Sequence, residues 1–398
     1  ESNSVIIRVL DKMILCGIFV FALASLTSKG ASSVGIGLAC LAWLIRIVVT
    51  KDYNFSKTKL DKAIIFFITA LLFSGLDVSK VNFFDEVDSI LLAILFYYVI
   101  INTIDDLDVV KQLSYTVFFS MLISLGYGFY QKFSLGMRRI EGFSFSLSYG
   151  LLLSIFLLFT LSYLLWGEIN LKKRFMLFIS SVGAGMNLLY TLSRGAWLGF
   201  IGGLASIVFL KDKRLIGALL ISFILLGVFL PATFIKRFKS IGDLRTGRSI
   251  ITRLNLWQGS WQMFLDHPIN GVGLGYFTRE FDNNYRSSFD ILANTTHAHN
   301  NFFHLLATTG LLGLLSFSWL ILRILYLLFN NYHSFKVKQW RLFLLASLGG
   351  VVSFTIQGLT EYSLGDAEPL RFFWFLIALC MIIINRKDSK KSIIITDL

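Results

Sequence analysis

The sequence has few charged residues for its length. Only 15% of its 398 residues are Asp, Glu, Lys or Arg, against about 25% in an ordinary soluble domain. Such a chain cannot cover a water-facing surface, because 55% of its residues are hydrophobic. With 3 Pro it is also unlike disordered or fibrous chains. The composition indicates a polytopic membrane protein.

Cysteine is scarce as well. Cys16, Cys40 and Cys380 all lie in apolar runs, which argues against a disulfide framework or a metal cluster. Acidic residues are outnumbered, giving a net charge of +13 that would suggest nucleic acid binding in a soluble protein. In a membrane chain, the positive-inside rule and anionic lipid explain this charge first. We therefore expect membrane lipid as a partner and no nucleic acid.

Hydrophobic runs long enough to cross a membrane recur along the chain. A spanning helix needs about 20 largely apolar residues, or about 17 at the short end. We therefore expect an all-α polytopic membrane protein with about twelve transmembrane helices. Nine fall in residues 1–231 and three in 301–398, before a cytoplasmic tail, while 232–300 forms one large extracytoplasmic loop containing short helices. The expected spans are 12–28, 32–50, 60–76, 88–104, 109–131, 143–166, 174–192, 195–210, 214–231, 301–329, 341–358 and 369–385.

The Lys and Arg residues between these spans orient them. With both termini in the cytoplasm, every second short loop is basic, as the positive-inside rule requires. Segment 232–300 then faces outward, and long loops escape that rule. A loop of this length is uncommon and usually functional. The inside cations include Arg46, Lys51, Lys57, Lys59, Lys62, Lys172, Lys173, Arg174, Lys211, Lys213, Arg214, Lys336, Lys338, Arg341, Arg386, Lys387, Lys390 and Lys391.

Arg194 lies at the outer membrane edge, in the turn after the seventh expected span. One interpretation is a snorkelling arginine whose head reaches the interface. The other is a guanidinium fixed at headgroup depth to hold a phosphate with two hydrogen bonds. A cation at the membrane edge is a functional hypothesis by default. Both interpretations remain open for this residue alone.

The long loop contains Arg253 in an amphipathic pattern. Apolar residues over 250–264 recur at close to 3.6-residue spacing, which predicts a helix that Arg253 would begin. The run Gly271-x-Gly273-x-Gly275 lacks the preceding strand and the acidic residue of a dinucleotide-binding loop. We interpret it as a turn that lets the chain lie close to another element.

Three of the five histidines follow within eight residues. With Asn294 or Thr295 as N-cap, His297, His299 and Asn300 would occupy the first turn of a membrane helix at its outer end. A helix N-terminus suits a phosphate, and an imidazole can take a proton from a hydroxyl. Metal binding is disfavoured, because residues two apart on a helix point to different faces. Capping and interface roles remain the alternative.

Cations also occur in a short outer loop, where insertion disfavours them. Arg138 and Arg139, with Lys132, violate the positive-inside pattern, and an anionic lipid-linked substrate would explain why they are retained. Glu361 ends another span on this side. It could pair with an arginine, although a solvated helix end is the slightly favoured interpretation.

Three motifs follow one another along the chain. They are Ser193-Arg-Gly-Ala-Trp-Leu-Gly199, then Arg253-Leu-Asn-Leu-Trp257 leading into His267-Pro-Ile-Asn-Gly-Val-Gly-Leu-Gly-Tyr-Phe277, then His299-Asn-Asn-Phe-Phe-His304 continuing to Gly313. Taken in this order, they resemble the O-antigen ligase and polymerase superfamily. The spacing and the single large outer loop before the histidine-bearing helix are similar to that family. The matching segment covers about residues 190–315, and the span layout extends the likeness over the chain. The motifs are specific for the superfamily but not for a member.

The resemblance implies a membrane glycosyltransferase of the GT-C-like type that needs neither metal nor cofactor. Such enzymes move a glycan from undecaprenyl diphosphate to an acceptor hydroxyl, with inversion, on the outer face of the inner membrane. Arg194 and Arg253 correspond to the family arginines that hold the diphosphate. His299 corresponds best to the proposed base, and His297 is the weaker candidate.

The chemistry agrees with these roles. Arginines can stabilise the charge that develops on a diphosphate leaving group, and a single base gives inversion. Retention would require a carboxylate nucleophile, for which the loop offers Asp266, Glu280 and Asp282.

The acceptor is not written in the motifs. We favour a ligase that transfers to lipid A–core, while a polymerase extending a lipid-linked repeat and a protein O-oligosaccharyltransferase remain open. A flippase or transporter would predict internal repeats and midspan charges, of which Arg323 is one of few.

Overall fold

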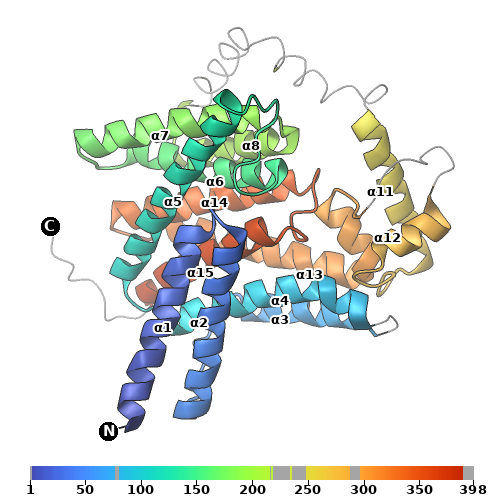
Figure 1. The fold of residues 1–398 in the computed structure, drawn as a ribbon, viewed down its shortest axis with the longest axis horizontal. Helices are drawn as coiled ribbons and strands as arrows, with labels where there is room; N and C mark the ends of the chain where they lie inside the picture. The colour runs from blue at the N-terminus through green and yellow to red at the C-terminus, as the bar shows by residue number, and fades with distance from the viewer. Residues whose placement is uncertain are drawn as a thin grey trace.

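The computed structural model describes residues 2–76, 80–215, 217, 234, 248–286 and 296–388. Every regular element among these residues is a helix, so the predicted all-α class is confirmed (Figure 1). The helices are α1 (Ser2–Ala24), α2 (Lys29–Thr50), α3 (Asp61–Phe73), α4 (Lys80–Thr103), α5 (Leu107–Phe133), α6 (Ser146–Trp166), α7 (Leu171–Tyr190), α8 (Arg194–Lys211), α11 (Arg248–Asp266), α12 (Phe277–Glu280), the π-helical turn η1 (Phe281–Tyr285), α13 (Asn301–Tyr332), α14 (Lys338–Gln357) and α15 (Ala367–Asp388).

Eight of the described helices are long and apolar enough to cross a membrane. They are α2, α4 from Glu86 onward, α5, α6, α8, α13, α14 and α15. The chain is therefore a multi-pass membrane protein, and the described residues do not confirm the predicted number of about twelve spans. With 13 residues, α3 is about 20 Å long, short of a hydrocarbon core of about 30 Å. The helices α1 and α7 are not among the eight, because each has three charged residues in its first half. These are Arg8, Asp11 and Lys12 in α1, and Lys172, Lys173 and Arg174 in α7. Nearly all of the expected span 214–231 lies outside the described residues.

The centre of the bundle is α15. In the most apolar stretch of α15, 83% of the residues are buried, compared with 72% in α6 and α14 and 33% in α2. The outer helices instead expose large apolar side chains, among them Val34, Leu41 and Val48 of α2. In a membrane protein such side chains face lipid, so exposed hydrophobic residues on these helices need no partner protein.

Small residues bring α8 and α14 into close contact. A Cβ atom added to Gly199 would lie 2.8 Å from the carbonyl oxygen of Ser353, and one added to Gly203 would lie 2.6 Å from that of Gly349. Small residues spaced four apart allow such close backbone approach in membranes. The antiparallel pair places the start of α8 beside the end of α14.

The helix α13 is broken at Gly310, whose φ of 63° and ψ of −160° are not helical. The turn after α11 fills the break. Val272 N–H donates to the Ala307 carbonyl, Gly273 N–H to the Thr308 carbonyl and Leu311 N–H to the Pro268 carbonyl, each at 2.9 Å. These bonds satisfy backbone groups that the break would otherwise leave unpaired.

The amphipathic helix predicted over 250–264 is present as α11, but Arg253 lies in its second turn rather than at its start. The glycine run behaves as interpreted from the sequence. Gly271 has a φ of 66°, and a Cβ atom there would lie 2.3 Å from the carbonyl carbon of Thr308. Only a glycine can make this approach between α11 and α13.

Candidate active site

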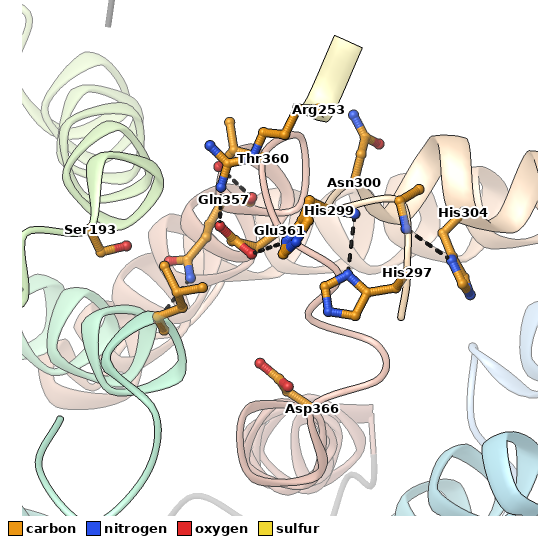
Figure 2. Close-up of polar contacts among 12 residues, drawn as sticks. Ser193, Arg253, His297, His299, Asn300, His304, Gln357, Thr360, Glu361 and Asp366 are labelled. Atoms are coloured by element: carbon orange, nitrogen blue, oxygen red, sulfur yellow. Dashed lines mark hydrogen bonds and ion pairs between the residues drawn. The ribbon is translucent and has the colours of Figure 1, made fainter. Parts of the chain in front are cut away.

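The segments that carry Arg253, His297 and His299 meet beside the connection from α14 to α15 (Figure 2). Residues 296–300 lie between α11 and the connection from α14 to α15. On one side the Trp257 indole of α11 donates to the Ala298 carbonyl at 3.0 Å. On the other side Asn301 N–H donates to the Gly358 carbonyl at 2.7 Å, and the Asn300 amide to the Leu359 carbonyl at 2.8 Å.

Both histidines of the His-x-His pair precede α13. Asn300 is the N-cap, with extended backbone, and its side-chain oxygen accepts from Phe302 N–H at 2.8 Å and Phe303 N–H at 3.1 Å. His299 has a φ of 48°, in the left-handed region that an α-helix excludes. The prediction that His297, His299 and Asn300 fill the first turn is therefore wrong, and the proposed caps Asn294 and Thr295 lie outside the described residues.

Glu361 joins two of the predicted site residues. One oxygen accepts a hydrogen bond from the Arg253 guanidinium, and the other lies 3.0 Å from Nδ1 of His299. Figure 2 shows both side chains pointing to this carboxylate, whose side chain is only 6% exposed. The interpretation of Glu361 as a solvated helix end is wrong, because a carboxylate this buried requires charged or hydrogen-bonding partners.

The contact with Glu361 determines which nitrogen of a neutral His299 is basic. A carboxylate can only accept, so the proton lies on Nδ1 and is donated to Glu361. The lone pair is then on Nε2, and one third of the His299 side chain is exposed. His299 therefore has the arrangement of a general base that is oriented by a carboxylate.

His297 has the opposite arrangement. Its Nδ1 accepts from the His299 backbone N–H at 3.2 Å, so a neutral ring carries its proton on Nε2 and its one lone pair is occupied. Burial, and secondly the neighbouring His299 imidazole, lower the pKa of His297 to about 3. The geometry thus separates two histidines that sequence reasoning could not distinguish.

The two imidazole rings lie closer together than a helix would allow. Their centroids are 4.3 Å apart, so the helical argument against a shared metal ion does not apply. Within the described part of the chain, no group of three or more His, Cys, Asp or Glu side chains could hold a metal ion.

Sequence reasoning missed Glu86, near the start of α4. Its carboxylate accepts from His304 Nε2 at 2.8 Å, from the Tyr362 hydroxyl at 2.6 Å and from Gly275 N–H at 2.6 Å. Nδ1 of His304 accepts a hydrogen bond from Ala298 N–H at 3.4 Å, so this network also holds the segment that carries His297 and His299. An acidic residue beside an apolar run was the available signal.

Asp366 is a second carboxyl that the sequence did not single out. It lies in the connection before α15 and accepts from the Ser148 hydroxyl at 2.7 Å. Burial raises the pKa of Asp366. Figure 2 shows Asp366 below Glu361 and His297, so it is a further titratable group at this end of the bundle.

Arg194 reaches the same region from α8. Ser193 is the N-cap of this helix, and Arg194 is its first residue. A Cβ atom added to Gly195 would lie 2.3 Å from the Thr360 hydroxyl oxygen, so the start of α8 touches the residue before Glu361. The structure therefore brings the Arg194 backbone, Glu361, Arg253 and His299 into one neighbourhood.

The other two predicted arginines, Arg138 and Arg139, lie in the connection between α5 and α6. Arg139 Nε donates to the Thr191 carbonyl at 2.8 Å, which fixes it against the turn before α8. Arg138 is exposed in the same connection. Phe234 of the long loop also lies here, with its ring centroid 6.0 Å from that of Tyr190 and 6.5 Å from that of Trp197.

The loop carboxylates considered as nucleophiles have partners within the loop. Asp266 accepts from the Tyr285 hydroxyl at 2.7 Å, Glu280 from the Asn284 amide at 2.8 Å, and Asp282 pairs with Arg286. None of these three contacts joins the loop carboxylates to His299 or Glu361.

Residues 176–318 match the model of a family described as O-antigen ligase. The match confirms the resemblance recognised from the motifs, and it contains Arg194, Arg253, His297 and His299. Glu361 and Glu86, which bind residues of this segment, lie outside it. No curated protein matches the chain.

Proposed function

We propose that this protein is an O-antigen ligase-like glycosyltransferase. It moves a glycan from undecaprenyl diphosphate to an acceptor hydroxyl on the outer face of the inner membrane, without metal and with inversion. The contact of His299 and Arg253 with the buried Glu361 carries the proposal, since it places a base beside a cation that can bind phosphate.

His299 is the proposed base. Its Nε2 takes the proton of the acceptor hydroxyl as that oxygen attacks the anomeric carbon, and the bond from this carbon to the diphosphate breaks. Glu361 stabilises the imidazolium that forms, and its 3.0 Å contact with Nδ1 holds the ring in the required orientation. One base and no enzyme nucleophile give inversion in a single displacement.

Arginines are proposed to hold the diphosphate. The guanidinium of Arg253 has five N–H donors, and Glu361 needs only part of them. Arg194 approaches from α8, and Arg139 and Arg138 extend the positive surface toward the connection before α6. Cations at these positions stabilise the charge that develops on the leaving oxygens, the task that a divalent ion has in other transferases.

The acceptor that we propose is lipid A–core. A lipid-linked repeat or a protein hydroxyl would use the same donor and the same base, so these acceptors are outcomes of the test. The purified protein should be incubated with undecaprenyl-diphosphate glycan and each acceptor in turn, and the product identified by mass. Donor that crosses the bilayer without forming a new glycosidic bond would contradict the proposal and favour a transporter.

Arg194→Lys tests the binding of the diphosphate. The substitution keeps the charge but loses the planar pair of donors, so most of the activity should disappear at unchanged protein level. EDTA and added Mg²⁺ should leave the wild-type rate nearly unchanged. Normal turnover in Arg194→Lys would favour the snorkelling interpretation instead.

A further inference from the structure

The helix α11 is apolar on the side that faces away from the protein. Its inner side packs Leu256, Ser260 and Met263, all fully buried, against the turn after α11, α12 and α13. Four large side chains on the other side, Ile251, Leu254, Trp261 and Leu265, are between 44% and 58% exposed.

These four residues form an apolar stripe along α11, which the exposed Gln258 interrupts. At 100° per residue, positions 251, 254, 261 and 265 fall within about a quarter of the helix circumference. The stripe lies directly opposite the buried positions 256 and 263. A helix that is apolar on two opposite sides is expected to bury both of them, and the residues that the structure describes cover only the inner side.

The stripe continues into the lipid-facing side of a membrane span. Beyond α11 the exposed Ile269 follows, and the neighbouring Pro268 carbonyl accepts from Leu311 N–H at 2.9 Å. Leu311 begins the second part of α13, where Leu315 and Leu322 are also exposed. Leu311–Tyr332 has a length of about 33 Å, enough to cross the hydrocarbon core.

Figure 1 shows α11 lying crosswise to α13 at the end of the bundle that carries the site. We propose that the stripe Ile251–Leu254–Trp261–Leu265 seats α11 in the lipid interface of the leaflet at this end. The bound surface is the boundary between headgroups and acyl chains, where an apolar face and a tryptophan are both favoured.

This placement of the α11 stripe in the lipid interface, called the lipid seat below, has a consequence for Arg253, which precedes Leu254 on the same helix. A helix held at the interface keeps this guanidinium at headgroup depth, where the diphosphate of a lipid-linked donor lies. This consequence rests on the proposed function, whereas the lipid seat rests only on the exposed stripe and the adjoining span.

Spin labels on single cysteines test the seat without any activity assay. In the Cys16→Ser protein, a single cysteine carrying the label replaces Leu254, Trp261 or Leu265 of the stripe. The same label at Gln262 reports the edge of the stripe, and at Asn283 it reports a position exposed to water. Each labelled protein is placed in nanodiscs. Oxygen collects in the bilayer and a nickel chelate stays in water. The ratio of oxygen to nickel collision rates should be severalfold higher at the three stripe positions than at Asn283. Gln262 lies 20° beyond Ile251 on the helix, so its ratio should fall between these two.

Equal ratios at all five positions would overturn the seat. Stripe labels that are shielded from both reagents, with short distances between labels on two copies, would also overturn it by showing a second chain on the stripe.

The effect on Arg253 is tested with Leu254→Ser,Leu265→Ser against Gln262→Ser. The double variant should raise the KM for the lipid-linked donor about tenfold with kcat little changed, equivalent to about 1.4 kcal/mol of binding. An unchanged KM, with the labels in lipid, would overturn the depth argument alone. Absence of transfer in the wild type would contradict the proposed function and leave the label result standing.

Discussion

His299 and His297 differ in which ring nitrogen has a lone pair to offer. Glu361 occupies Nδ1 of His299 and leaves Nε2 basic, whereas a backbone N–H occupies Nδ1 of His297. We therefore expect His299→Ala to lose transfer by about 100-fold or more, the usual scale for a general base. His297→Ala should lose much less. Rates are to be measured with folded protein at saturating donor.

Glu361→Gln is the companion variant. It keeps the size of the side chain but removes the charge that stabilises an imidazolium, so kcat should fall about 10- to 100-fold. A loss of this size corresponds to the free energy of a hydrogen bond to a charged group, about 1.5–3 kcal/mol.

Donor binding should persist in His299→Ala, because the arginines hold the diphosphate. The opposite ranking, with His297→Ala inactive and His299→Ala active, would reverse the assignment.

Burial of neutral His297 predicts a pH effect on stability. In the unfolded chain this imidazole binds a proton below about 6.5, while in the folded protein it does so only near pH 3. Between these values the unfolded state binds more protons, so stability falls as pH falls through this window. Thermal melts of His297→Gln should lose less stability than wild type between pH 7 and pH 4. Parallel curves for the two proteins would contradict the buried neutral state.

At the scale of elements, the turn 268–273 and the break in α13 depend on each other. Gly271 has both a left-handed backbone and a backbone neighbour at 2.3 Å from an added Cβ, whereas Gly136 has a similar φ of 62° with nothing within 4 Å. Alanine at Gly136 should cost about 1–2 kcal/mol for its backbone conformation alone. Gly271→Ala should lower the melting temperature further and reduce transfer. Equal melting temperatures would show that the contact with Thr308 is dispensable.

Sequence periodicity identified most helices because each is a local pattern. The break in α13 was not predictable, since residues 301–329 read as one apolar run and the groups that fill the break come from residues 268–273. Glu361 was misjudged for the same reason. Its partners lie 108 and 62 residues away, and spacing along the chain carries no information about such contacts.

At the scale of the whole molecule, loop charges predicted which connections share a side. The segments around Arg139, Arg194, Arg253, His299 and Glu361, all assigned to the outer side, do meet at one end of the bundle. The number of spans was less predictable, because hydropathy does not distinguish a short helix such as α3 from one that crosses the bilayer. Which end faces outward remains a prediction.

Cysteines in the connections before and after α6 test this orientation. Ser134 is exposed in the connection that contacts the turn before α8, and Glu168, 78% exposed, follows the other end of α6 and pairs with Lys338. The 21 residues of α6 extend about 30 Å, the thickness of the hydrocarbon core. Cys40 and Cys380 are buried, so Cys16→Ser removes the exposed thiol of the described chain.

An impermeant thiol reagent should then label Ser134→Cys in intact spheroplasts and Glu168→Cys only after the membrane is opened. This result follows if the arginines and His299 face the leaflet where a lipid-linked glycan is presented, with the basic loops at the cytoplasmic end. The reverse pattern would put the site on the cytoplasmic side and contradict transfer on the outer face. Labelling of both positions from outside would mean that α6 does not cross the bilayer.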